Sequence, residues 1–482
     1  MRYIIGLDEG TTSARSVLYD IKTNQILKSV NKKFKQYFPK PGWVEQNPKD
    51  ILNAQFESLN EVLDGIDPSE VVGIGITNQR ETVVAWDRRT GEPIYNAIVW
   101  QCRRTSRLIK NLSVRTKKII KNKTGLIPDA YFSATKMQWI LDNVKGAQRL
   151  ADDGNLCFGN INTYLAFVMT GEFVTDTTNA SRTMLFNINT MEWDEWLLKE
   201  FRIPKNTLPE IVSCDYIVGK CKDFYNIPLC AMIGDQQASL FGQGCTTKGT
   251  SKTTFGTGIF TLVNTGTKPV NENHLLSTIA YTIGKSTYYA IEGSIYSGCS
   301  AIEWLKNSLG LYTTYDEIDK LASTLESNDG VYFVPAFTGL GAPYWNSGAK
   351  TTIVGLTYGC NKAHIARSIL ESMAYNTKAI LDELKGIKIS DLKVDGGGTK
   401  NEFLNQFLSD ITGKDVLLGQ SSEATALGAI YMAGIATHVF TIPSIKEMYK
   451  PQKRYMPNLD EKTATTYYNK WKKAVALSQK GV

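Results

Sequence analysis

The sequence predicts an α/β protein made of two similar domains. Its N-terminal part contains two branched apolar runs at 3–20, a helical stretch at 48–63 and an apolar strand at 71–77, an order typical of α/β folds. The length of 482 residues is more than one core usually organises. Residues 251–263 repeat the opening pattern of strand, glycine turn and strand, so we expect a second domain to begin near residue 250.

The individual elements follow from local patterns. Apolar residues at helical spacing predict the helix at 48–63, and Pro68 lies beyond its end. The stretch at 71–77 (VVGIGIT) predicts a buried strand. The basic stretch at 99–104 predicts the start of a helix. Further helices are predicted at 128–139 (after a turn), 162–169, 300–308, 364–384 and 423–433, the last rich in small residues and suited to tight packing at a hinge.

Composition and charge exclude several classes of protein. A hydrophobic content of 42% and a charged content of 21% are typical of a globular protein. The net charge of +7 is mild and its basic residues are spread out, so we expect no nucleic-acid partner. The apolar runs are too short for membrane insertion, and the N-terminus enters a strand pattern without a signal peptide. We therefore expect a cytoplasmic protein.

The cysteines and histidines indicate neither a zinc site nor a disulfide framework. Eight cysteines are scattered along the chain without a C-x-x-C pair, and only three histidines are present. We expect reduced and mostly buried thiols, as in a cytoplasmic protein.

The opening hairpin has the residues of a phosphate site. Its tip presents backbone N–H groups with the hydroxyls of Thr11, Thr12 and Ser13, and such concave donor arrays bind anions. Asp8, at the end of the first strand, could hold Mg²⁺ through water, and Arg15 could make a bidentate contact to phosphoryl oxygens. The alternative is an ordinary surface hairpin with turn-forming residues.

Two further strand ends carry candidate ligand residues. Arg80 and Glu81 follow the strand at 71–77, where open α/β sheets place ligands, and together they suit a polyol; the alternative is a surface ion pair. Trp100 is either a core residue or an apolar wall for the carbon face of a polyol. Asp235, after the strand-like run that ends at Gly234, is either a catalytic carboxylate or a helix cap.

A glycine run in the second half points to close approach by a ligand. The three glycines at 396–398 precede a helix and allow a flat or anionic ligand to approach the backbone. The sequence contains neither a Walker-A P-loop nor a Rossmann G-x-G-x-x-G. No role follows from the polar-to-apolar stretch at 180–186.

Together these motifs resemble, in their order, the actin, Hsp70 and sugar-kinase superfamily, and more narrowly the FGGY carbohydrate kinases. The residues that carry the resemblance are 8–13 (DEGTTS), 39–46 (PKPGWVEQ), 76–82 (ITNQRET), 96–105 (NAIVWQCRRT), 178–188 (TNASRTMLFNI), 234–238 (GDQQA), 255–258 (FGTG) and 334–345 (VPAFTGLGAPYW). The NQRET and WQCRRT stretches are similar to those of the members that phosphorylate glycerol.

The resemblance implies a fold and an activity. The fold would be two ribonuclease-H-like (actin-like ATPase) domains flanking a catalytic cleft, with 1–248 on the glycerol and phosphate side and 249–482 on the adenine nucleotide side. The activity would be phosphorylation of glycerol to sn-glycerol 3-phosphate, using ATP and Mg²⁺. The family also implies a homodimer or homotetramer.

The resemblance also implies residue roles. Asp235 would be the general base, Arg15 would steady the transferring phosphoryl group, and Asp8 would hold Mg²⁺ through water. Glycerol would be bound by Arg80, Glu81, Trp100, Tyr131, Asp235, Gln236 and Phe260. ATP would be bound by Thr11, Thr12, Ser13, Arg15, Thr257, Cys299, Glu303, Gly397 and Asn401.

Some residues depart from the family pattern. Glu9 stands where Gln is common, Gly398 where Ala is usual, and Cys299 and Glu303 where familiar bacterial members have Gly and Gln. The short segment 218–228 lacks the glycine-rich effector loop and any histidine, so neither fructose bisphosphate feedback nor activation by histidine phosphorylation is expected.

Two other functions compete with glycerol phosphorylation. One is kinase activity on another polyol or a ketose, against which the Arg80–Glu81 pair and Trp100 argue. The other is a catalytically idle nucleotide-binding regulator with the same fold. The presence of Asp8, Arg80 and Asp235 argues against it, because an idle protein has no chemical need for a base.

Overall fold

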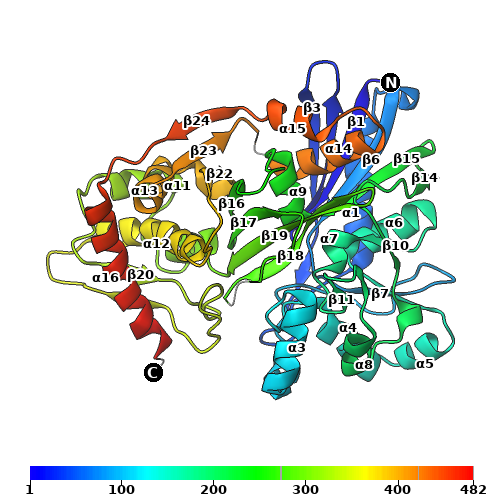
Figure 1. Cartoon of the computed structure of the whole chain (residues 1–482), viewed down its shortest axis with the longest axis horizontal. Coiled ribbons are helices and arrows are strands. Elements are labelled where there is room, and N and C mark those ends of the chain that lie inside the picture. The colour runs from blue at the N-terminus through cyan, green and yellow to red at the C-terminus, as the bar shows by residue number, and fades with distance from the viewer. Residues whose placement is uncertain (272–273, 422, 481–482) are drawn as a thin grey trace.

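The computed structural model describes residues 1–271, 274–421 and 423–480 and contains two large mixed sheets with helices around and between them (Figure 1). The first sheet runs in the order β14 (Gly219–Cys221), β15 (Ile227–Gly234), β6 (Val71–Asn78), β1 (Tyr3–Glu9), β2 (Ser13–Asp20) and β3 (Gln25–Lys33). The second runs in the order β18 (Leu276–Ile283), β19 (Ser286–Ile295), β17 (Ile259–Gly266), β16 (Ser251–Phe255), β22 (Asp391–Asp395), β23 (Asp415–Gly419) and β24 (Pro451–Tyr455).

The two sheets repeat one strand topology. β1 pairs antiparallel with β2, which pairs antiparallel with β3, and on its other side β1 pairs parallel with β6. In the second sheet β16 pairs antiparallel with β17, which pairs antiparallel with β19, while β22 lies parallel on the other side of β16. The shared pattern confirms the internal repeat and the α/β class predicted from the sequence. The domain limits of 1–248 and 249–482 stay a prediction.

Central strand β1 is apolar or aromatic, with one glycine, from Tyr3 to Leu7, because both of its faces are covered. Ile5 and Leu7 pack into a core with α1 (Pro48–Leu63) and α6 (Ile161–Thr170). Ile4, on the opposite face, packs into a second core with α9 (Asp235–Gly242) and α14 (Ala424–Ala436). Alternate side chains of a strand point to opposite faces, so a strand between two helix layers needs apolar residues on both faces.

Several predicted elements are confirmed at or near their expected bounds. α1 occupies the predicted 48–63, with Pro48 in its first turn and the Asn47 side chain accepting from the Lys49 N–H as N-cap. The strand at 71–77 is β6. The other predicted helices are α4 (Ser133–Asn143), α6, α10 (Cys299–Asn307), α12 (Lys362–Asp382) and α14.

The prediction that a helix begins within 99–104 is wrong. The segment forms a turn, and α2 (Ser106–Asn111) begins only after it. Its side chains have tertiary partners instead: the buried Arg104 side chain donates to Glu45 at 2.7 Å, and the Trp100 indole N–H donates to Thr11 Oγ1 at 3.0 Å. These contacts with distant residues override the local helical pattern.

Helices α9 and α14 lie between the two sheets and join them. Their core includes Ile4 and Val17 of the first sheet together with Leu262 and Ala290 of the second. The helices cross closely because glycine provides the space: a Cβ at Gly428 would lie 1.9 Å from the Ala238 carbonyl oxygen. The small residues at 423–433 therefore allow two helices to cross closely between the halves of the molecule, as the sequence predicts.

Replacing Gly428 by Ala is expected to destabilise the protein. The alanine would gain about 0.5–1 kcal/mol of helix preference. Overpacking against the α9 backbone costs about 1–3 kcal/mol and outweighs that gain. The midpoint of urea unfolding should fall relative to the wild type and to Thr425→Ala, a control at a half-buried position of the same helix. An unchanged midpoint would show that the crossing tolerates a methyl group.

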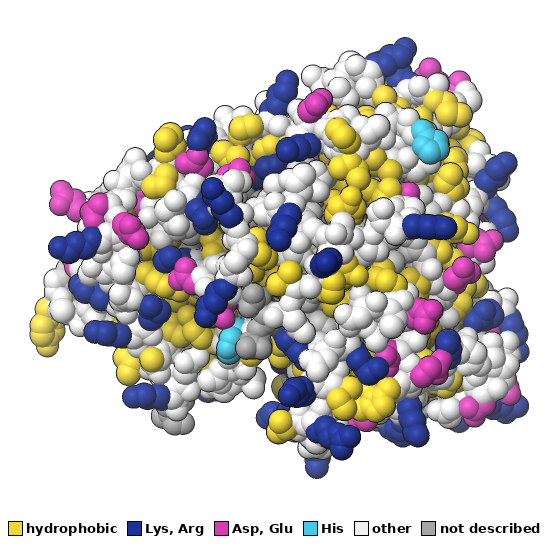
Figure 2. Space-filling model, in the orientation of Figure 1, with side chains coloured by type: hydrophobic (Ala, Val, Ile, Leu, Met, Phe, Trp, Pro, Cys, Tyr) yellow, Lys and Arg dark blue, Asp and Glu magenta, His cyan; other side chains and the backbone are white. Residues whose placement is uncertain are grey.

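The remaining helices cover the outer faces. In the first half, α3 (Val114–Thr124), α4, α5 (Ala147–Asp152) and α8 (Glu195–Phe201) gather at the lower right of Figure 1. In the second half, α11 (Tyr315–Ser323), α12, α13 (Glu402–Thr412) and α16 (Glu461–Gln479) form the outer layer, and the chain ends after α16. Lys and Arg side chains are scattered among Asp and Glu on the face shown in Figure 2. Within the described residues, none of the helices has the length and apolar character to cross a membrane.

Candidate active site

A cavity of about 150 Å³ lies where the two halves meet. Strand ends of the first sheet and the β16–β17 turn of the second sheet form its walls. All the residues predicted to bind glycerol line it. The complete lining is Thr11, Arg80, Glu81, Trp100, Tyr131, Asp235, Gln236, Thr254, Gly256, Thr257, Gly258 and Phe260.

Asp235 enters this cavity at the first turn of α9, directly after β15. Its Oδ1 accepts from the Gln236 backbone N–H at 2.7 Å and lies 3.1 Å from the Arg80 Nε. Among the described residues, Oδ2 has only a long contact of 3.4 Å with the Gln236 side-chain amide. The side chain is 28% exposed, so Oδ2 is the oxygen open to a ligand. The interpretation of Asp235 as a helix cap is wrong, because Gly234 occupies the N-cap position.

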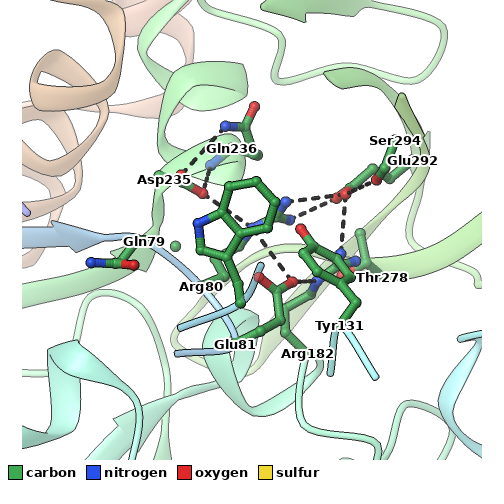
Figure 3. A network of polar contacts seen from close by, with 12 residues as sticks. Gln79, Arg80, Glu81, Tyr131, Arg182, Asp235, Gln236, Thr278, Glu292 and Ser294 are labelled. Atoms are coloured by element: carbon green, nitrogen blue, oxygen red, sulfur yellow. Dashed lines mark hydrogen bonds and ion pairs between the residues drawn. The ribbon is translucent and has the colours of Figure 1, made fainter. Parts of the chain in front are cut away.

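Arg80 and Glu81 belong to a buried ionic network rather than to a surface pair (Figure 3). Arg80 donates to both carboxylate oxygens of Glu292, at 2.6 and 3.1 Å. Arg182 donates to Glu292 at 3.1 Å and to Glu81 at 2.5 Å. All four side chains are at most 2% exposed. The network holds Arg80 and Glu81, two residues of the cavity wall, in fixed positions. Glu292 belongs to β19 of the second sheet, so the network joins the two halves.

The charges in this network favour the ionised form of Glu292. Burial alone would raise its pKa, but the Arg182 and Arg80 guanidinium groups outweigh burial and lower the pKa to about 2. Sequence reasoning missed both Glu292 and Arg182. The signal that could have found Glu292 is a charged residue in the middle of an otherwise strand-like run, at 286–295.

Aromatic rings form one side of the cavity. Trp100 lies edge-on to Tyr131 and to Phe260, with ring centroids 5.7 and 6.4 Å apart. The indole N–H of Trp100 is occupied by Thr11, so the rings present carbon surface to the cavity. The interpretation of Trp100 as a wall residue fits this position better than the core alternative.

The opening hairpin reaches the cavity through its tip. Its turn closes through a Gly10 N–H to Ser13 carbonyl bond of 2.9 Å, and Thr11 lines the cavity. Thr12, Ser13 and Arg15 are not part of that lining. Arg15 forms an ion pair with Glu423, a partner that the sequence did not suggest.

Asp8 lies in a setting that suits a divalent cation bound with phosphates. Burial raises the pKa of Asp8 to about 7; the Arg15 charge opposes this effect, and the Glu423 and Asp235 carboxylates add to it. Among the described residues, no group of three or more His, Cys, Asp or Glu side chains could hold a metal alone. Mg²⁺ commonly takes one or two protein carboxylates and completes its shell with water and phosphate. Asp8, a single carboxylate with Glu423 and Asp235 nearby, fits this mode of Mg²⁺ binding.

Glu9 can substitute for the glutamine that is common at its position. It is fully buried and accepts from the Gln79 side-chain amide at 3.1 Å. Burial raises the pKa of Glu9 well above its usual value, which favours the neutral carboxylic acid. A neutral acid has nearly the size and shape of the amide it replaces.

A larger cavity of about 580 Å³ continues on the second half. It shares Gly256 and Thr257 with the smaller cavity. The predicted nucleotide residues in its lining are Thr257, Cys299, Glu303, Gly397 and Asn401. Cys299 and Glu303, the departures from the family pattern, therefore both face this space. Burial raises the pKa of the Cys299 thiol to about 11, and Glu303 accepts from the Asn307 amide at 2.9 Å.

Comparison with known proteins agrees with this geometry. Models of the N-terminal and C-terminal domains of the FGGY family of carbohydrate kinases match residues 3–242 and 252–437. The chain is 48% identical to a glycerol kinase of Clostridium botulinum over 98% of both chains. It is 46% identical to a glycerol kinase of Thermococcus gammatolerans over 98% of this chain and 97% of that protein.

A solved structure extends the likeness to three dimensions. The crystal structure of Plasmodium falciparum glycerol kinase with ADP superposes with a TM-score of 0.92 at 37% identity, covering 99% of this chain and 98% of the other. The match confirms the predicted fold of two ribonuclease-H-like domains. The chain belongs to the FGGY family of carbohydrate kinases.

Proposed function

We propose that this chain is a glycerol kinase, which transfers the γ-phosphoryl group of ATP to a terminal hydroxyl of glycerol and forms sn-glycerol 3-phosphate. The observation that carries the proposal is the open Oδ2 of Asp235 in a small cavity that adjoins a nucleotide-sized one. The likeness to glycerol kinases along the whole chain supports it.

The small cavity suits a three-carbon polyol. Arg80 and Glu81 bring a donor and an acceptor to one wall, and the Glu81 Oε2 has no hydrogen-bond partner within the described residues. The rings of Trp100 and Phe260 provide the apolar surface against which the carbon chain would lie.

Asp235 is the general base of this reaction. Its Oδ2 accepts the proton of the terminal hydroxyl as the hydroxyl oxygen forms a bond to the γ-phosphorus. The bond from that phosphorus to the β,γ-bridging oxygen breaks, and ADP leaves with the electron pair. Arg80 and the Gln236 N–H hold Oδ1 at the same time, which keeps Oδ2 directed at the substrate. Phosphoryl transfer depends mainly on such positioning and on charge stabilisation.

The hairpin and the second half bind the nucleotide. Thr11, Thr12, Ser13 and Arg15 face the phosphates, and the lining of the larger cavity binds the nucleoside. Asp8 would hold Mg²⁺ through water, and the ion would offset the negative charge of the phosphates. A cytoplasmic location and a homodimeric or homotetrameric assembly stay predictions that come with the family.

The proposal is tested by ADP release with Mg·ATP, comparing glycerol with xylulose, ribulose, gluconate and dihydroxyacetone. Turnover with glycerol, and at most weak turnover with dihydroxyacetone, is the expected result. Preference for a ketose or gluconate would leave the family assignment intact but reject glycerol as the substrate. Binding of ATP without turnover of any of these substrates would support the regulatory alternative.

A further inference from the structure

A buried lysine lies behind the cavity, and the mechanism above does not use it. Lys252, on β16, is fully buried, and its Nζ donates to Gln236 Oε1 at 2.5 Å and to Thr254 Oγ1 at 2.6 Å. Both partners line the small cavity, but Lys252 itself does not. Burying an ammonium group is costly unless it is hydrogen-bonded, and these two bonds to residues of the cavity lining offset that cost.

The charges around Lys252 come from both halves of the molecule. Burial lowers its pKa; the Asp395 and Asp235 carboxylates oppose this effect, Arg80 adds to it and Glu292 opposes it. The bond to Gln236 connects the second sheet to the first turn of α9, where Asp235 lies one residue before Gln236. Lys252 is thus linked to the catalytic segment through a single side-chain amide.

The chemistry of lysine determines which way that amide faces. An ammonium group only donates hydrogen bonds, so Gln236 must turn its oxygen towards Lys252. The amide nitrogen then points the other way, to 3.4 Å from the Asp235 Oδ2. With the opposite amide orientation, a carbonyl oxygen would face the carboxylate and repel it.

We propose that Lys252 is a positioning residue that fixes Gln236 as a hydrogen-bond donor towards the substrate hydroxyl and the catalytic carboxylate. The inference rests on the proposed glycerol phosphorylation. In it, the Gln236 amide donates to a lone pair of the attacking hydroxyl while the Asp235 Oδ2 accepts its proton. The donor thereby orients the hydroxyl so that its hydrogen points at the base.

A double-mutant cycle tests this role. Lys252→Met should lower kcat/KM for glycerol by about 10–100-fold, since a misoriented group near the reacting atoms costs up to about that much, and leave KM for ATP nearly unchanged. Gln236→Ala should cause a similar loss. The two changes together should lose little more than either alone, because residues that act through one contact are not additive. Additive losses would overturn the proposal.

Lys393→Met is the matched control for loss of a buried charge. Lys393, on neighbouring β22, is also buried, and its Nζ donates to the Gln243 backbone carbonyl at 2.6 Å, away from the cavity lining. It should lower the unfolding midpoint by as much as Lys252→Met but keep kcat/KM for glycerol. Equal losses of kcat/KM in both variants would reduce Lys252 to a structural role.

Gln236→Glu tests the orientation without disturbing the core. The carboxylate keeps an acceptor for Lys252 but replaces the donor beside Asp235 by a second acceptor, so kcat/KM for glycerol should fall at least as far as in Gln236→Ala. Wild-type activity in this variant would overturn the proposal. Absence of glycerol turnover in the wild type would instead reject the proposed function, so the two failures are distinguishable.

Discussion

Asp235→Asn is expected to lower kcat for glycerol phosphorylation by about 10²–10⁴-fold, the range that general base catalysis contributes. The amide has nearly the same size as the carboxylate but cannot accept the hydroxyl proton at neutral pH. The cavity wall should stay intact, because Arg80 keeps its two bonds to Glu292. KM for ATP and the affinity for glycerol should therefore change only slightly. Steady-state ADP release and glycerol calorimetry measure the two effects separately.

A matched change at the neighbouring residue provides the control. Gln236→Asn retains an amide at the first turn of α9 but shortens it, so it should raise KM for glycerol without the same loss of kcat. Near-wild-type kcat in Asp235→Asn would reject Asp235 as the base. Loss of glycerol binding in that variant would assign Asp235 to substrate binding instead.

Glu292→Ala is expected to cause the largest loss of stability. The change leaves the Arg80 and Arg182 guanidinium groups buried without their shared acceptor. Breaking a buried ion pair in this way costs about 3–5 kcal/mol. The midpoint of urea unfolding should fall sharply. Released from Glu292, Arg80 should also lose its fixed position beside Asp235, so kcat/KM for glycerol should fall in the protein that remains folded.

The second half contains a suitable comparison for that experiment. Arg367 and Glu371 form another buried ion pair, 2.7 Å apart, and neither residue lines the two cavities. Glu371→Ala should lower the unfolding midpoint in the same way but leave kcat/KM for glycerol unchanged. If both variants lose activity to the same extent, the ionic network around Glu292 has no special part in forming the site.

The sequence predicts those parts of the site that depend on neighbours along the chain. The hairpin follows from two apolar runs around a glycine turn, and Asp235 follows from its place after a strand. Both signals lie within a few residues of the feature that they predict. The same holds for α1, whose apolar spacing, N-cap and proline are local.

The rest of the site depends on partners far along the chain. Arg80 meets Glu292 across 212 residues, and Arg15 meets Glu423 across 408. No periodicity or short motif encodes such a pairing, since it exists only when the two sheets come together. The helix predicted to begin within 99–104 fails for the same reason, because the sequence does not show that the Arg104 side chain pairs with the distant Glu45 carboxylate.

The return of α14 to the first sheet has a consequence for synthesis of the protein. One face of β1 is covered by α14, a helix that is translated much later. The ribosome must therefore release residues up to 436 before this face can be shielded from water. Until then the nascent chain exposes Ile4 and its apolar neighbours, so the N-terminal sheet cannot complete its folding before α14 has emerged.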